Sequence, residues 1–166
     1  MSDIPTYALS VRQPWAWAIA VGAKDIENRT TFAVSKGDMK PKRIAIHASL
    51  GMTRDEYEDA AETINMICRQ LGRRECPRPD ELVRGAIIGA ATVTAIVKKH
   101  KSPWFFGPRG LVLTEQELWT PIPASGALGY FQWRRSEAPL VAPLPWMVAW
   151  PDKAIRTRTG NVGKRP

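Results

Sequence analysis

Three charged residues, Lys24, Glu27 and Arg29, stand close enough in the sequence to act together on a ligand. We expect residues 25–31 to form a strand, in which alternate side chains share a face. Glu27 and Arg29 should then point to one side, beside Lys24 in the preceding turn, while Ile26 points into the core. Two cations and one carboxylate suit the binding of a polar, anionic ligand, because a guanidinium binds phosphate or carboxylate with two hydrogen bonds. A structural ion pair is the alternative, and the residues alone leave both interpretations open.

A short helix must precede this strand and position its charges. Pro14 suits the first turn of a helix, where its missing N–H would have no partner. Gly22 ends the helix, as glycine does where the chain needs a left-handed residue. We therefore predict a strand over residues 6–11 and a helix over 14–21, so that the charges lie where the helix is followed by the second strand.

The remaining hydrophobic pattern predicts several short strands and one long helix. Thr53 and Glu56 form a capping box at the start of a helix over residues 54–71. Residues 85–97 are apolar on both faces, as expected of a central strand buried on both sides. We expect further extended segments over 43–48, 111–114, 118–123 and 128–133, and a polar turn over 35–42. Many short strands with few helices indicate a mixed α+β domain with a barrel-like sheet.

Six blocks of this sequence resemble the signature of the ASCH domain family, which is related to the PUA domains of RNA-modifying proteins. The most specific are Ser10-Val-Arg-Gln-Pro-Trp-Ala and Gly22-Ala-Lys-Asp-Ile-Glu-Asn-Arg. The others follow in the family's order: residues 43–49, 85–90, 102–110 and 126–133. The resemblance implies a small PUA-like β-barrel with flanking helices over residues 1–135. It leaves residues 136–166 as a proline-rich extension with a basic C-terminal tail.

The resemblance also implies where a ligand would bind. The cleft would hold Lys24, Glu27 and Arg29, and the start of the first helix would form one wall. The neighbouring residues would be Gln13, Trp15, His47, Trp104, Phe106 and Arg109. An aromatic ring among them would stack on a base, as in proteins that bind RNA or single strands. The implied ligand is thus RNA or another single-stranded nucleic acid, with a modified base as one candidate. The structural alternative is that Trp15 belongs to the hydrophobic core and His47 to a buried strand.

Basic residues outside the cleft would contact phosphate. Lys98, Lys99 and Lys101 form a basic corner after the long strand. The last 16 residues carry five cations against Asp152, in a chain whose net charge is +8. Such segments attract a phosphate backbone without reading its sequence, although a basic tail also serves solubility alone.

Some ASCH proteins are enzymes, which makes a small hydrolase the alternative function. The family's amidohydrolases remove the acetyl group from N4-acetylcytidine with a lysine, a threonine and a glutamate, and other members are reported as ribonucleases. Lys24 matches that lysine, whereas Glu27 occupies the position of the threonine, so the expected nucleophile is missing. In the hydrolase hypothesis, Lys24 and Glu27 act as an acid–base pair on a phosphodiester or an amide.

Other classes of function lack support in the sequence. No Walker loop, GxSxG elbow or HExxH helix is present, which disfavours classical nucleotide, serine and zinc hydrolysis. Cys68 and Cys76 are too few for a disulfide framework, and with His47 and His100 they lack zinc-site spacing, so we expect no metal or cofactor. The chain has no apolar run of about 18 residues and no secretory signal, so we expect a cytoplasmic protein without membrane contact. A third candidate is a protein-interaction domain in which residues 146–150 dock a partner.

Overall fold

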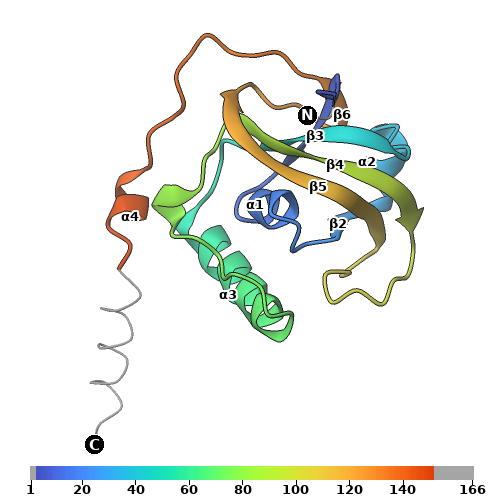
Figure 1. Ribbon diagram of the computed structural model, residues 1–166, viewed down its shortest axis with the longest axis horizontal. Coiled ribbons are helices and arrows are strands. Elements are labelled where there is room, and N and C mark those ends of the chain that lie inside the picture. Colours follow the sequence, from blue (N-terminus) through green and yellow to red (C-terminus); the bar gives the residue numbers. More distant parts are fainter. Residues whose placement is uncertain (1–2, 152–166) are drawn as a thin grey trace, which may run out of the picture.

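The computed structural model describes residues 3–151 and contains one curled sheet, with one helix inside the curl and the others outside it (Figure 1). The elements, in chain order, are β1 (Tyr7–Val11), α1 (Trp15–Ala20), β2 (Ile26–Arg29), α2 (Thr31–Lys36), β3 (Lys42–Ala48), α3 (Arg54–Gln70), the 3-10 turn η1 (Pro79–Glu81), β4 (Ala86–Val97), β5 (Arg109–Pro123), β6 (Tyr130–Gln132) and α4 (Pro145–Val148). None of the helices described is both long and apolar enough to cross a membrane.

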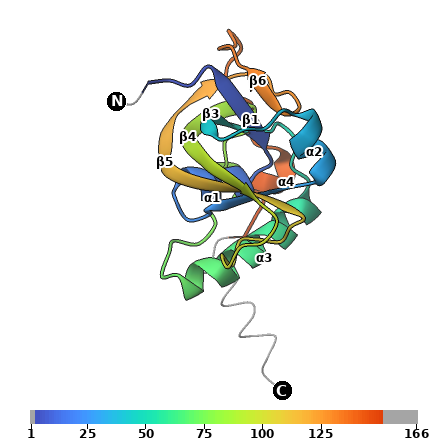
Figure 2. The same ribbon diagram turned by 90° about the vertical axis from the view of Figure 1, so that its right-hand side faces the viewer.

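The six strands form one sheet in the order β2-β5-β4-β3-β1-β6. Neighbouring strands within residues 3–151 run antiparallel, except β1 and β3, which are parallel. The sheet curls around α1 as a half-barrel, and α3 lies outside the curl (Figures 1 and 2). The chain therefore has the α+β architecture that the sequence predicts. The curl leaves β2 and the β1–β6 pair at opposite margins of the sheet.

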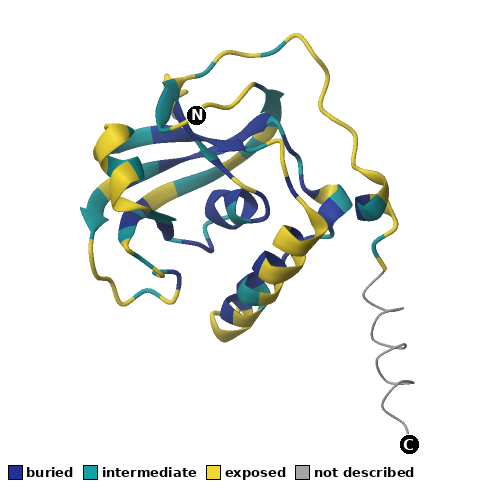
Figure 3. Cartoon of the chain, turned by 180° about the vertical axis from the view of Figure 1, so that it is seen from behind, coloured by how far each residue is buried: buried dark blue, intermediate teal, exposed yellow. Residues whose placement is uncertain are grey.

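Two helices fill the space beside the sheet, and both begin close to where the sequence predicts. α1 is buried along nearly its whole length, and its Ile19 packs against the concave face of the sheet. α3 begins with the predicted capping box, in which the Thr53 hydroxyl accepts from the Glu56 N–H and the Glu56 carboxylate accepts from the Thr53 N–H. One side of α3 is buried against the body and the other faces solvent (Figure 3). Cys68 lies on the buried side, as expected of a core residue.

β4 is a central strand with apolar side chains on both faces, as predicted. Ile88 belongs to the main core around α1, whereas Ile87 packs on the other face with Trp119 and Phe131. Next to Ile88, the backbone of β4 comes very close to the bulged part of β5. A Cβ on Gly89 would lie 2.0 Å from the carbonyl oxygen of Glu117. Only a glycine fits this position, because any side chain would overlap the neighbouring strand.

The structure differs from the sequence prediction after β2. The strand expected over 25–31 ends at Arg29, and Thr30 caps the helix α2 by accepting a hydrogen bond from the Ala33 N–H at 3.0 Å. Part of the segment predicted as a polar turn, residues 35–42, is therefore the end of this helix. The prediction missed α2 because the helix has six residues, of which none is buried, so it carries no apolar stripe.

The late strands also differ from their predicted bounds. The two extended segments expected over 111–114 and 118–123 are one long strand, β5, which bends where Glu115 adopts a φ of +50°. The closing strand β6 is shorter than the predicted 128–133. A bend within a strand interrupts the alternation of apolar residues, which is why the pattern reads as two strands.

The described part of the C-terminal extension packs on the rest of the domain. The chain returns from β6 along the surface, where Arg84 donates to the carbonyl oxygen of Ala142 at 3.0 Å. α4 then buries Met147 completely beside α3, and the rings of Trp146 and Trp150 lie against Tyr57 at centroid distances of 6.2 and 5.0 Å. The tryptophans proposed to dock a partner thus contact the domain itself. The basic tail lies outside the described residues.

Removing the anchor of α4 should destabilise the whole domain. Met147→Ala should lower the free energy of unfolding by about 3 kcal/mol, because emptying a fully buried methionine site costs about 2–5 kcal/mol. Urea denaturation followed by tryptophan fluorescence measures this change. Val148→Ala is the matched control, because Val148 is 60% exposed in the same helix. Equal stability of the two variants would show that the extension does not contribute to the fold.

Candidate functional site

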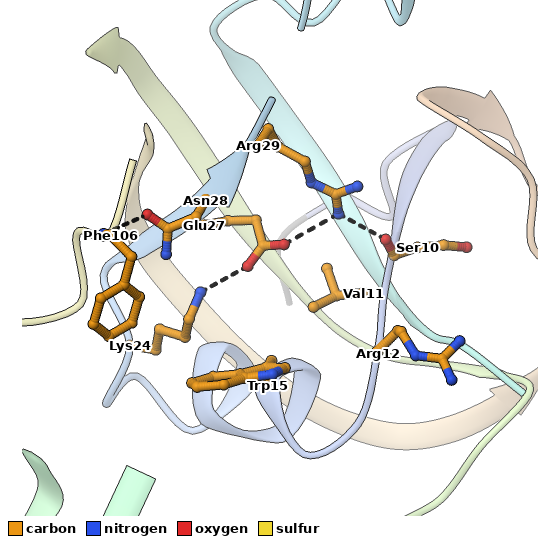
Figure 4. Close-up of a pocket in the computed structure, with 9 residues that line it drawn as sticks. All are labelled: Ser10, Val11, Arg12, Trp15, Lys24, Glu27, Asn28, Arg29 and Phe106. Atoms are coloured by element: carbon orange, nitrogen blue, oxygen red, sulfur yellow. Dashed lines mark hydrogen bonds and ion pairs between the residues drawn. The ribbon is translucent and has the colours of Figure 1, made fainter. Parts of the chain in front are cut away.

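A pocket opens where the two margins of the curled sheet face each other. β6 pairs with β1 from Tyr7 to Leu9, so the end of β1 beyond Leu9 has no β6 partner. Here Arg29, at the end of β2, reaches across and donates to the backbone oxygen of Ser10 at 2.8 Å (Figure 4). The pocket has a volume of about 400 Å³. Its lining residues are Ser10, Val11, Arg12, Trp15, Lys24, Glu27, Asn28, Arg29 and Phe106.

The three charged residues of the predicted cleft form a continuous chain along one side of this pocket. Glu27 accepts from the Lys24 ammonium at 2.7 Å through one oxygen, and its other oxygen lies 3.2 Å from the Arg29 guanidinium. Lys24 also donates to the backbone oxygen of Ile26. Lys24 and Glu27 are nearly buried, with side chains 2% and 10% exposed. The alternation predicted for β2 is confirmed, since Glu27 and Arg29 line the pocket and Ile26 is buried in the core.

The net charge of these three paired side chains favours ligands that carry negative charge or hydrogen-bond acceptors. One carboxylate faces two cations, so Lys24, Glu27 and Arg29 together leave one positive charge on the wall. Within residues 3–151, the Nε–H of Arg29 is buried and has no acceptor. A buried donor without a partner is costly, so a ligand that supplies an acceptor gains from binding here. The ion pair and the charged wall of the pocket are thus made by the same residues.

Two aromatic rings form the apolar part of the pocket. Trp15 begins α1, and its ring centroid lies 5.7 Å from the Lys24 ammonium. Phe106 lines the pocket from the loop between β4 and β5 (Figure 4) and is 59% exposed. A flat apolar group can therefore lie between the rings and the charged wall, because aromatic faces stack on planar ligands.

Asn28 holds the Phe106 loop in place. Its side-chain oxygen accepts from the N–H groups of Phe106 and Gly107 at 2.8 and 3.1 Å, and its amide donates to the carbonyl oxygen of Trp104 at 2.9 Å. Three hydrogen bonds to backbone thus fix the loop against the edge strand. Sequence reasoning did not single out Asn28. The sequence offered one indication of its importance, which is its position between Glu27 and Arg29.

The sequence also did not indicate the end of β1 as part of the site. Ser10, Val11 and Arg12 line the pocket together with the predicted residues. Of these, Arg12 carried a signal, because a cation directly after a strand and before a helix is well placed to meet a ligand. Ser10 contributes its backbone oxygen and Val11 an apolar surface, and their only signal in the sequence was membership of the block Ser10-Val-Arg-Gln-Pro-Trp-Ala that resembles the ASCH signature.

Several predicted site residues do not line this pocket. Gln13 is buried and braces α1, because it donates to the Val83 carbonyl oxygen at 2.7 Å and accepts from the Trp17 N–H. Trp104 is completely buried in the core around α3, so its ring is not available for stacking. Arg109 donates to the carbonyl oxygen of Pro108, its neighbour. The basic corner is exposed in the loop after β4 and is also absent from the lining: Lys98, Lys99 and Lys101.

His47 is a buried residue of β3 beside Ser10 of β1, and it is not among the residues that line the pocket. This agrees with the alternative that His47 belongs to a buried strand. Its Nδ1 lies 2.8 Å from the Ser10 hydroxyl and its Nε2 lies 2.8 Å from the carbonyl oxygen of Ala124. Since a carbonyl accepts, Nε2 carries the proton, and in the neutral ring Nδ1 accepts from the Ser10 hydroxyl. Gly126 closes this site, because a Cβ there would lie 2.5 Å from the hydroxyl oxygen of Ser10. Burial lowers the pKa of His47, and the bond to Ala124 partly opposes this.

Comparisons with known proteins add no assignment to this geometry. No protein-family model matches the chain, and no curated protein matches it significantly. Within residues 3–151, no group of three or more His, Cys, Asp or Glu side chains is arranged to hold a metal ion. The chemistry of the site therefore has to be inferred from the charges, rings and hydrogen bonds of the pocket itself.

Neutralising the bridging carboxylate should destabilise the fold. Glu27→Gln should lower the free energy of unfolding by about 3 kcal/mol, because removing one partner of a buried ion pair leaves an uncompensated charge. Glu58→Gln is the control, since Glu58 pairs with Arg54 at 3.0 Å on the exposed side of α3 and should change stability by less than about 0.5 kcal/mol. Chemical denaturation measures both, and similar small effects would contradict a structural role for Glu27.

His47 should make stability depend on pH. Its pKa is lower in the folded protein than the ordinary value of 6.5, so the unfolded chain binds a proton first as the pH falls. Stability is then fully present above pH 6.5 and decreases below it, down to the folded pKa. Each pH unit between the two pKa values corresponds to about 1.4 kcal/mol. The free energy of unfolding, measured from pH 7.5 to about 5, should fall in the wild type and should vary less in His47→Gln. His100→Gln is the control, because His100 is exposed, and it should behave like the wild type.

Proposed function

We propose that this chain is an ASCH-type module with a PUA-like fold, which binds RNA or another single-stranded nucleic acid by inserting one base into the pocket. The observation that carries the proposal is the combination of two aromatic walls, Trp15 and Phe106, with a cationic wall made by Lys24 and Arg29. Proteins that bind single strands combine these two features, because the rings stack on bases and the cations meet the phosphate backbone.

The dimensions of the pocket support a single planar group as the ligand. Its volume of about 400 Å³ is near the lower end of the usual range for small-ligand sites, about 300–1,000 Å³. A duplex does not expose its bases to such a pocket, whereas an unstacked base in a single strand can enter it. The pocket therefore suits a base with its sugar rather than a double helix.

The polar groups of the pocket suit a base edge with both donors and acceptors. Lys24 and the free Nε–H of Arg29 donate, whereas the oxygens of Glu27 accept. A modified base that alters its exocyclic groups would change these contacts, which makes recognition of a modification a reasonable extension. The resemblance to the ASCH signature supports this proposal, because Lys24, Glu27 and Arg29 are the residues that carry the motif.

Phosphate contacts would come from outside the pocket. The basic corner, Lys98, Lys99 and Lys101, is exposed in the loop that continues to Phe106. It carries three positive charges within four residues and suits the backbone of a strand whose base occupies the pocket. The basic tail would add to this attraction in the same way.

The test is a fluorescence-anisotropy titration with labelled single-stranded RNA, single-stranded DNA and duplex DNA at two salt concentrations. Phe106→Ala should weaken single-strand binding about tenfold, since stacking on one aromatic ring contributes about 1–3 kcal/mol. Phe32→Ala is the matched control, because Phe32 is 70% exposed on α2 and lies outside the pocket lining. Both phenylalanines are exposed, so neither change should unfold the protein.

Arg29→Ala provides the electrostatic part of the same test, with circular dichroism to check that the variant is folded. It should weaken binding and reduce the loss of affinity that salt causes, because one cation no longer takes part. No binding of any probe, or binding that neither variant changes, would contradict the proposal.

A hydrolase acting on RNA or modified nucleosides is the second candidate function, favoured by the buried contact of 2.7 Å between Lys24 and Glu27 inside the pocket. In this reading the pair transfers a proton to or from the reacting group of the bound ligand. The same binding samples, analysed for products, test it. Product formation that Lys24→Met abolishes while binding persists supports an enzyme, whereas absence of products from every probe supports a binding module.

A further inference from the structure

A second cavity adjoins the pocket and shares part of its wall. It lies between the start of α1 and the exposed side of α3 and has a volume of about 320 Å³. Arg12 and Trp15 line both cavities, so these two residues lie at the boundary between them. The lining residues of the second cavity are Arg12, Gln13, Trp15, Glu56, Asp59, Ala60 and Thr63.

Arg12 is held firmly at the boundary between the cavities. Its guanidinium donates to the Glu56 carboxylate at 2.6 Å, and that carboxylate is itself held by the N–H of Thr53 at 2.8 Å. The hydrogen bond from Arg12 lowers the pKa of Glu56. On its other side the guanidinium lies against Gly51, where an added Cβ would be 3.2 Å from both terminal nitrogens. These two contacts place the guanidinium at the boundary between the cavities, with the side chain half exposed.

The guanidinium keeps donors free for a ligand. Glu56 takes one of its five N–H groups, and no other acceptor within residues 3–151 bonds to the rest. A guanidinium with free parallel N–H groups binds the oxygens of a phosphate in pairs. Since Arg12 already lies at the boundary between the cavities without a ligand, binding has less side-chain freedom to remove, which favours affinity.

We propose that the two cavities form one cleft for two consecutive nucleotides, in which Arg12 binds the phosphodiester between them. The inference rests on the proposed function and specifies its ligand as a chain rather than a free nucleoside. One base lies between Trp15 and Phe106 in the first pocket, and the next unit lies in the second cavity beside α3. The phosphate that joins them meets the one side-chain cation that lines both cavities.

The second cavity suits a sugar and a base held by polar contacts. The carboxylate of Asp59 has no hydrogen-bond partner within residues 3–151, while Thr63 donates to the Asp59 backbone oxygen. A free carboxylate accepts from ribose hydroxyls or from the amino group of a base. Apart from the Trp15 ring that it shares with the first pocket, the second cavity has no aromatic lining residue. The second unit therefore adds affinity chiefly through its phosphate and its polar groups.

The experiment compares nucleosides with dinucleotides as competitors. A labelled single-stranded RNA hexamer bound to the full-length protein is displaced by adenosine, cytidine, guanosine or uridine, and by ApA, CpC, GpG or UpU. In the wild type, at least one dinucleotide should compete about tenfold better than its nucleoside, as expected for an added phosphate contact of the charge-assisted kind. In Arg12→Ala this advantage should fall below about threefold, and the salt dependence of hexamer binding should decrease by about one phosphate contact.

Arg69→Ala is the matched control, because Arg69 is also an exposed arginine paired with a glutamate, at the far end of α3. It should retain the advantage of the dinucleotide. Gly51→Ala keeps the charge but crowds the guanidinium, so it should reduce the advantage without unfolding the protein.

The outcomes separate this inference from the proposed function. If the dinucleotide has no advantage in the wild type, or keeps its advantage in Arg12→Ala, the two-nucleotide cleft is overturned. The base pocket stands in that case, provided that Phe106→Ala still weakens competition by the nucleosides. If the hexamer does not bind to the wild type, both the pocket and the cleft are overturned.

Discussion

The carboxylate of Glu27 orients the side chain that links the two margins of the sheet, which is Arg29. Lys24 and Arg29 would repel each other in this nearly buried place, and Glu27 lies between them within 2.7 and 3.2 Å. Arg29 is thereby oriented to reach the backbone of Ser10 on β1. No backbone ladder joins β2 to β1, so side chains make this connection. A gap bridged by side chains leaves room for a ligand, which a closed ladder would not.

This arrangement explains why the residues of a structural ion pair also form the charged wall of the pocket. Buried charges need partners, and Lys24 and Glu27 satisfy each other most directly. Arg29 is the member with unused capacity, since its Nε–H has no acceptor within the described residues. Asn28 supports the same wall from behind by holding the backbone of the Phe106 loop. One strand of four residues thus orders the charged wall and one of the two aromatic walls.

The curl of the sheet determines the rest of the site. α1 lies inside the curl, and at Gly89 the backbone of β5 comes so close to β4 that an added Cβ would overlap the carbonyl oxygen of Glu117. The start of α1 then carries Trp15 into the pocket, and the turn before it carries Arg12 to the rim. α3 supplies Glu56, which fixes Arg12 through a carboxylate that also caps the helix. The position of the Arg12 charge at the rim therefore depends on the first turns of α1 and α3.

The sequence by itself determined the local features of this protein. Alternation along β2 places Glu27 and Arg29 on one face, the capping box at Thr53 starts α3, and two apolar faces make β4 a central strand; all three depend on neighbours a few residues apart. Tertiary structure alone decided which distant residues meet. The sequence could not show that Phe106 rather than Trp104 reaches the pocket, that Glu56 on the distant helix α3 pairs with Arg12, or that His47 faces away. Strand order, curl and loop anchoring set these positions, because they arise from packing between segments far apart in the chain, which no local pattern records.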